Sequence, residues 1–110
     1  MPAETAGCRL QLDARALGLG YRLGSDTLLV LLDLAVHAAD SPEGPVVAAS
    51  YRDVARRLGI SKDTVGRRVA LLRRAGVLVE YRRCADRFEA PSYLLHLAAA
   101  GVRRETAAAA

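Results

Sequence analysis

Residues 50–79 read SYRDVARRLGISKDTVGRRVALLRRAGVLV, and this stretch decides the fold. A serine that can cap a helix opens it, and Gly59 is a typical helix end, which together predict a helix over residues 51–58. Ser61 is a second helix cap, and it predicts a further helix over residues 62–75. Because only a short turn joins the two helices, the stretch is expected to be a helix-turn-helix unit.

The second helix of this unit has two different sides. Val65, Val69 and Leu72 recur at helical spacing and form its inner, apolar side. The opposite side is narrow and mostly basic, with Asp63, Arg67, Ala70 and Arg74. A helix of this kind that projects from the surface of its domain can enter the major groove of DNA.

Beyond Gly76 the apolar period changes from that of a helix to that of a strand. Alternation over residues 77–82 predicts one strand, and residues 92–97 predict a second. The polar stretch 83–91 between them is expected to be the tip of a hairpin.

Before the unit, Ser25 is expected to cap a helix over residues 26–39. That helix is apolar on most of its sides, so either the N-terminal segment or a second copy of the chain should cover it. Residues 40–45 are expected to be a loop, followed by a short β-prone stretch. Asp33, His37 and Asp40 have a spacing that could hold a divalent metal, but a solvated helix face is the preferred interpretation, and no cofactor is expected.

These patterns divide the chain into three expected segments. Residues 1–24 are an N-terminal segment that contains a short strand near Arg9–Asp13 or serves as a dimer arm, with its glycines interpreted as turns. Residues 25–97 are the helix-turn-helix domain, and residues 98–110 are an alanine-rich tail or short helix.

Composition limits the class of protein. A chain of 110 residues that is 52% hydrophobic corresponds to one globular domain. It has no apolar run of the ~18 residues that a membrane span needs, and no signal peptide is recognised, so a cytoplasmic, nucleoid-associated protein without membrane contact is expected. Cys84 is interpreted as a free cysteine rather than as a redox switch. No arrangement of nucleophile, base and acid indicates an enzyme.

Charge is concentrated in one part of the chain. Residues 50–87 hold eleven basic and four acidic side chains, whereas the rest of the chain is net negative. Such a basic block indicates a polyanionic partner. Four arginines are interpreted as solvated surface: Arg56, Arg57, Arg73 and Arg74.

The helix-turn-helix stretch resembles bacterial winged helix-turn-helix regulators. It is similar to the GntR type and to the winged-helix modules of phage and plasmid regulators and replication proteins. The matching features are Val54-Ala55, Leu58-Gly59, Ser61, Thr64-Val65, Val69, Leu72 and Gly76. The resemblance covers about residues 25–97 and implies an α+β winged helix-turn-helix fold, with a three-helix core and a C-terminal β-hairpin wing.

The resemblance also implies DNA contacts at the start of the first helix of the unit and in the first turns of the second. The positions it points to are Arg52, Ser61, Lys62, Asp63, Thr64 and Arg67. Arg68 is grouped with them as a DNA-binding candidate, although it sits beside the apolar side of its helix and is expected to snorkel or pair. On the hairpin, Arg82, Arg83 and Arg87 can reach phosphates or the minor groove. Arg67 is the best candidate for a bidentate contact with guanine. Asp63 either accepts from a cytosine or orients Arg67 four residues on. Gly66 departs from the polar residue common in the family.

The expected function is sequence-specific binding of double-stranded DNA by a transcriptional regulator, a repressor that acts as a homodimer on a palindrome. One alternative is a DNA-binding accessory factor in plasmid or phage replication, partition or excision. Another is a winged-helix adaptor that docks on a protein partner. RNA binding is a weaker alternative, because few aromatic residues are present for base stacking.

Overall fold

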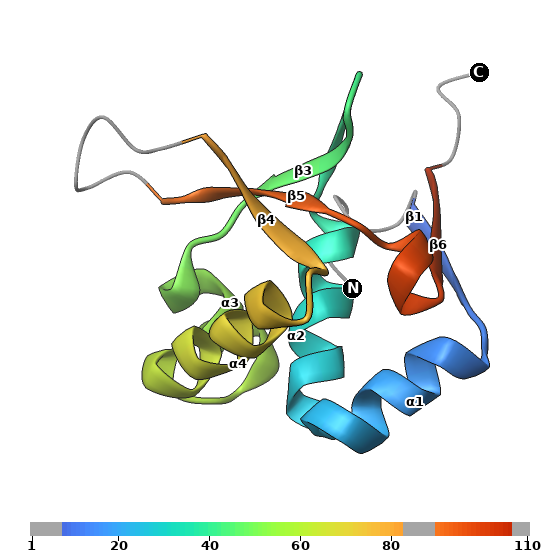
Figure 1. Ribbon diagram of the computed structural model, residues 1–110. Helices are drawn as coiled ribbons and strands as arrows, with labels where there is room; N and C mark the ends of the chain where they lie inside the picture. The colour runs from blue at the N-terminus through green and yellow to red at the C-terminus, as the bar shows by residue number, and fades with distance from the viewer. Residues whose placement is uncertain (1–7, 83–89, 107–110) are drawn as a thin grey trace.

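The computed structural model describes residues 8–82 and 90–106 (Figure 1). The four α-helices of this part are α1 (Ala14–Leu23), α2 (Ser25–Val36), α3 (Tyr51–Leu58) and α4 (Lys62–Arg74). The strands are β1 (Cys8–Leu12), β2 (Ala39–Ser41), β3 (Gly44–Ala48), β4 (Leu78–Arg82), β5 (Ser92–Leu95) and β6 (Val102–Thr106), and Ala98–Ala100 form a 3₁₀ turn. The α+β class predicted from the sequence is confirmed.

Helix α2 is the centre of the core. It packs against α1, α3, α4 and strand β3, and its Val30, Leu31 and Leu34 are almost completely buried. A helix that is apolar on most sides needs several neighbours, and here elements of the same chain supply them. Of the two covers expected for this helix, the N-terminal segment is therefore the one observed.

The main sheet is antiparallel with the strand order β2-β3-β5-β4. Strands β4 and β5 form the predicted hairpin, with Val79 opposite Leu94. The expectation for residues 40–45 was wrong, because β2 and β3 pair there as a tight hairpin instead of forming a loop. For the same reason the helix predicted over 26–39 ends early, at Val36, where the chain turns into β2.

Of the glycines that were expected to mark turns, Gly18 and Gly20 lie within helix α1 instead, whereas Gly24 does lie at the break between two helices. Asp13 caps this helix by accepting a hydrogen bond from the backbone N of Arg15 at 2.8 Å. At Gly20 the missing side chain lets Leu28 of α2 approach closely, since a Cβ there would lie 3.3 Å from its Cδ2. Gly24, with φ of 101°, separates α1 from α2, so Ser25 begins α2 instead of capping it.

Val102–Thr106 form a strand, which corrects the tail or short helix expected over residues 98–110, of which 107–110 lie outside the described residues. Strand β6 pairs with β1 along its whole length, with Leu10 opposite Arg104 (Figure 1). The Arg104 guanidinium reaches the C-terminal end of α2, where it donates to the carbonyl oxygens of Ala35 (2.8 Å) and Ala38 and to Asp40 (2.8 Å). The alanines do not enter the strand: Ala98–Ala100 form the 3₁₀ turn, and the strand begins at Val102, a β-branched residue that favours strands.

Candidate nucleic-acid interface

The helix-turn-helix unit forms as the sequence predicts. Ser50 Oγ accepts from the backbone N of Asp53 (3.3 Å) and begins α3, and Gly59 ends it with a left-handed φ of 69°. Ser61 then caps α4, with its Oγ accepting from the backbone N of Thr64 at 3.0 Å. These local caps fix where α4 starts and how it leaves the turn.

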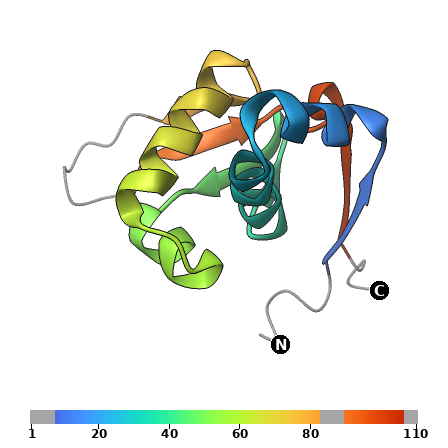
Figure 2. The ribbon, with the colours of Figure 1, turned by 90° about the horizontal axis from the view of Figure 1, so that it is seen from below.

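Helix α4 is anchored on one side and open on the other. Val65, Val69 and Leu72 are at most 1% exposed. The exposed residues are Lys62, Asp63, Arg67, Ala70, Arg73 and Arg74. Figures 1 and 2 show the helix at the surface of the molecule, beside the hairpin of β4 and β5. An α-helix with its side chains is about 10–12 Å across, which is close to the width of the DNA major groove.

The exposed start of α4 carries a short polar chain of contacts. Thr64 Oγ1 lies 2.8 Å from Ser61 Oγ, and Arg67 Nη2 donates to Thr64 Oγ1 at 3.4 Å. The side chain that orients Arg67 is therefore Thr64, and not Asp63 as one alternative held. The guanidinium remains exposed and keeps donors free for an acceptor outside the protein.

Arg68 lies apart from these residues. Its side chain is half-buried, Nη2 lies 3.5 Å from Asp26 of α2, and Nε is buried without a hydrogen-bond partner in the described part of the chain. The grouping of Arg68 with the DNA-facing residues is corrected, because its side chain turns inward and ties α4 to α2.

Gly66 faces α3. A Cβ at this position would lie 3.6 Å from the ring of Tyr51, which is an ordinary contact distance. A larger side chain at this position would therefore lie against Tyr51 of α3.

The far end of α4 meets the base of the wing. Arg73 Nη2 lies 3.6 Å from a Glu80 carboxylate oxygen, and its guanidinium carbon lies 5.8 Å from the centre of the Tyr93 ring. Arg74 lines a shallow groove between α4 and β4 together with Ala70 and Val79. Both arginines were expected to be plain solvated surface, because helical spacing does not reveal that α4 packs against β4.

The wing is held at its base on the other side as well. The Tyr81 hydroxyl donates to Glu43 Oε2 at 3.2 Å, which links β4 to the turn between β2 and β3. Arg82 ends β4, while Arg83 and Arg87, expected at the wing tip, lie outside the described residues.

The first half of the unit carries basic residues with different roles. Arg52 is exposed on the first turn of α3. Arg56 lies 3.6 Å from Asp53, an exposed pair of little energetic weight. Arg57 binds Asp33 of α2 through two nitrogens, at 3.0 and 2.7 Å, so it ties α3 to α2 rather than lying free in solvent.

The three side chains whose spacing could hold a divalent metal make other contacts in the structure. Asp33 is paired with Arg57, Asp40 with Arg104, and His37 Nδ1 lies 2.8 Å from the backbone oxygen of Asp33. Within the described ranges, no group of three or more metal-ligating side chains comes together.

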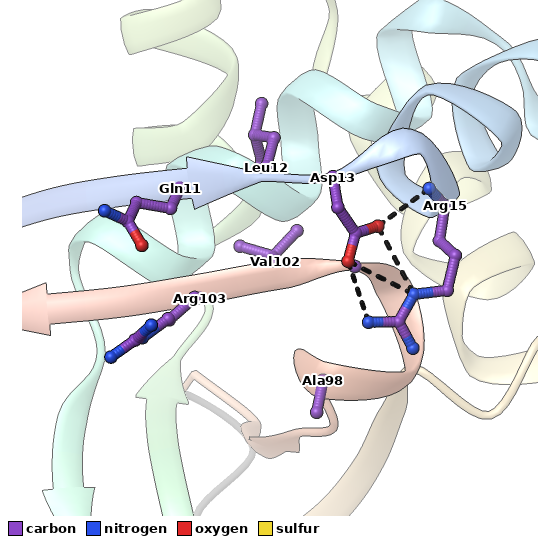
Figure 3. Close-up of a pocket in the computed structure, with 8 residues that line it drawn as sticks. Gln11, Leu12, Asp13, Arg15, Ala98, Val102 and Arg103 are labelled. Atoms are coloured by element: carbon purple, nitrogen blue, oxygen red, sulfur yellow. Dashed lines mark hydrogen bonds and ion pairs between the residues drawn. The ribbon is translucent and has the colours of Figure 1, made fainter.

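A second hollow lies between β1, the start of α1 and β6 (Figure 3). Its most prominent polar groups are Asp13 and Arg15, whose side chains are joined by hydrogen bonds as short as 2.8 Å. The side-chain bond from Arg15 is the main reason that the pKa of Asp13 is lowered. Asp13 is thus held ionised as a helix cap and is not poised for proton transfer, and we place the candidate site on α4.

A helix-turn-helix unit followed by an antiparallel hairpin is the architecture of the winged-helix class. Residues 48–79 match the family of winged helix-turn-helix DNA-binding domains, so the chain carries a DNA-binding domain of this class. No curated protein and no solved structure gave a match to the chain. None of the helices in the described ranges is long and apolar enough to cross a membrane.

Proposed function

We propose that the protein binds double-stranded DNA sequence-specifically and regulates transcription as a repressor in the nucleoid, by binding and not by catalysis. The observation that supports this proposal most directly is the position of Arg67, which projects from the open side of α4. The other side of the helix is buried in the core through Val65, Val69 and Leu72. A rigid helix that displays a guanidinium is suited to read a guanine edge in the major groove.

Phosphate contacts would come from the residues around Arg67. Lys62 and Ser61 sit at the N-terminus of α4, where backbone N–H groups and the helix dipole favour an anion. Arg52 on α3 and Arg74 in the groove beside β4 lie exposed on the same unit. These residues would position the duplex, whereas Arg67 would discriminate between bases.

An adaptor that docks on a protein partner is less well supported. Such a domain would be expected to show apolar residues on the open side of α4, but most side chains there are charged. The accessory roles in replication, partition or excision use the same DNA-binding surface, and the position of the target site separates them from repression. The likeness to the GntR type remains a prediction.

The test begins with selection of bound fragments from a pool of random duplexes. The protein is expected to enrich one motif, and sites that overlap promoters would support a regulator, whereas sites at replication origins or partition loci would contradict it. Enrichment of no motif would refute sequence-specific binding.

Variants then assign the contacts. Arg67→Ala should weaken the selected site by about 1–3 kcal/mol and relax the preference at one base position. Arg103→Ala is the matched control, because it removes another exposed arginine, from β6, on the other side of α2 from α4. Equal losses for the two variants, or equal losses of Arg67→Ala on selected and random DNA, would contradict the assigned role.

A further inference from the structure

Helix α1 exposes an apolar stripe, hereafter the α1 stripe, which consists of Ala14, Leu17, Gly18 and Tyr21. These residues share the outer face of α1, opposite the buried Ala16 and Leu19. Tyr21 is 79% and Leu17 53% exposed, the two highest values among the large apolar side chains that the structure describes. Two such residues one turn apart on one helix face form a continuous surface rather than scattered exposure.

The stripe is free when the candidate DNA-binding helix is occupied. Helices α1 and α4 both pack on α2, and Figure 2 shows α2 end-on between them. A partner on α1 therefore does not compete with DNA on α4.

We propose that the α1 stripe joins two copies of this chain into a homodimer, with the two α1 helices packed antiparallel. This deepens the proposed function, because a dimer would present two α4 helices to a two-fold symmetric site.

The sequence of the stripe is self-complementary in this arrangement. A two-fold axis between positions 17 and 18 sets Tyr21 opposite Ala14 of the other copy, and Ala14 opposite its Tyr21. Leu17 and Gly18 then each lie beside their own counterparts near the axis. An isologous interface requires this reciprocity: the large Tyr21 meets the small Ala14, and the two Leu17 side chains meet next to the two glycines.

Gly18 supports a close helix–helix contact. A Cβ at this position would meet no atom within 4 Å, so nothing inside the protomer requires a glycine there. Glycine inside a helix costs about 1 kcal/mol relative to alanine. At a crossing point between two helices, the absent side chain allows the close approach of their backbones.

The charges at the edge of the stripe are compatible with a second copy. Antiparallel packing brings Arg22 near Arg15 of the other copy, whose guanidinium is already bound to Asp13 at 2.8 Å. The two helix dipoles also run in opposite directions, so each positive end lies near a negative one. Because the stripe itself has no charged residue, it offers nothing to recognise a strongly acidic or basic partner.

The contact is small. Helix α1 has 10 residues and is about 15 Å long, so it buries less than the ~800 Å² per partner of a standard interface. We therefore expect a dimer that dissociates at micromolar concentrations in solution and that two half-sites on one duplex strengthen.

Cysteine cross-linking tests the geometry, in a Cys8→Ser, Cys84→Ser background. Gly18→Cys lies beside the axis and should form a disulfide between copies under mild oxidation. Ala14→Cys lies about 5 Å from the axis, so its two copies stand about 10 Å apart, beyond the ~7 Å limit between Cα atoms of a disulfide. Cross-linking of both variants, or of neither, would overturn the antiparallel arrangement.

Sedimentation from about 1 µM to about 1 mM tests the surface itself. The unaltered protein should self-associate and Leu17→Glu should remain a monomer, whereas Val79→Glu, an equally apolar exposed position on β4, should behave like the unaltered protein. Self-association of Leu17→Glu at the unaltered strength would overturn the proposal. If the dimer forms but no duplex binds, the proposed function fails while the interface stands; the reverse result removes only the interface.

Discussion

Arg104 connects strand β6 to the end of α2. Its replacement by methionine should lower the free energy of unfolding more than the same replacement of the neighbouring Arg103. The Arg104 side chain is 8% exposed, and its guanidinium donates to Ala35, Ala38 and Asp40. The last carbonyl oxygens of a helix lack partners within it, and a cation at that end also interacts favourably with the helix dipole. Arg104 thus caps α2 from a strand about seventy residues away in sequence.

The expected loss of stability follows from the contacts that Arg104→Met removes. Methionine keeps an apolar stem, so packing changes little. Two buried carbonyl oxygens lose a charged donor, at about 1–3 kcal/mol each, while release of a buried guanidinium from its desolvated site offsets part of that loss. The Asp40 contact adds little, because that carboxylate is exposed. We expect a net loss of about 2–4 kcal/mol, which lowers the Tm by about 8–16 °C for a domain of this size.

The assay is urea denaturation followed by circular dichroism, with a thermal scan beside it. Arg103→Met is the matched control, since the adjacent side chain on β6 points to solvent and should change stability by less than about 0.5 kcal/mol. If the Arg104 variant lost no more stability than this control, then β6 would not hold α2, and the observed C-terminal strand would be dispensable to the fold.

Two further predictions concern backbone strain and alkaline pH. Gly101→Ala should cost about 3 kcal/mol or more, since φ is 75° and the new Cβ would clash with Asp13 Oδ1 and lie 2.7 Å from the backbone N of Ala16. Gly59→Ala is the control, with a similar φ of 69° and open space around it, and should cost only about 1–2 kcal/mol. Equal losses of the two variants in urea denaturation would contradict the clash. Burial, and secondly the hydrogen bond with Tyr51 (3.1 Å), raise the pKa of Tyr93, so the folded state keeps this phenol neutral where the unfolded chain ionises it. The resulting stability is fully present below pH ~10 and is lost above it, by up to about 1.4 kcal/mol per pH unit, and Tyr93→Phe should flatten this dependence; an unchanged alkaline slope would assign the effect to other groups.

The helix-turn-helix unit could be predicted because its signals are local. Ser50, Gly59 and Ser61 set the ends of α3 and α4 through contacts within a few residues, and the inner stripe of α4 follows from its helical period. The exposure of Arg67 follows from the same period. The prediction that this helix contacts DNA therefore rests on about thirty residues of sequence.

The ends of the domain could not be predicted, because their structure depends on distant partners. Helix α1 contains glycines that favour turns locally, and it forms because Ala16 and Leu19 bury against the rest of the core. Strand β6 exists through pairing with β1, more than ninety residues earlier in the chain. The helical period places Arg68 beside the apolar side of α4, but its partner Asp26, 42 residues away in sequence, could not be predicted.

These ion pairs reduce the number of basic side chains that are available to bind DNA. Local sequence shows eleven basic residues over positions 50–87, but four of those that the structure describes pair with acidic side chains of the same domain, one of them being Arg56 beside Asp53. Arg57 and Arg68 tie α3 and α4 to the carboxylates of α2, and Arg73 lies against Glu80. A guanidinium held in this way gains less from a phosphate, because it must first give up its own carboxylate. The electrostatic footprint for DNA is therefore narrower than the composition indicates, and it is concentrated at the exposed start of α4 and along the groove beside β4, where Lys62, Arg67 and Arg74 have no ion-pair partner among the described residues.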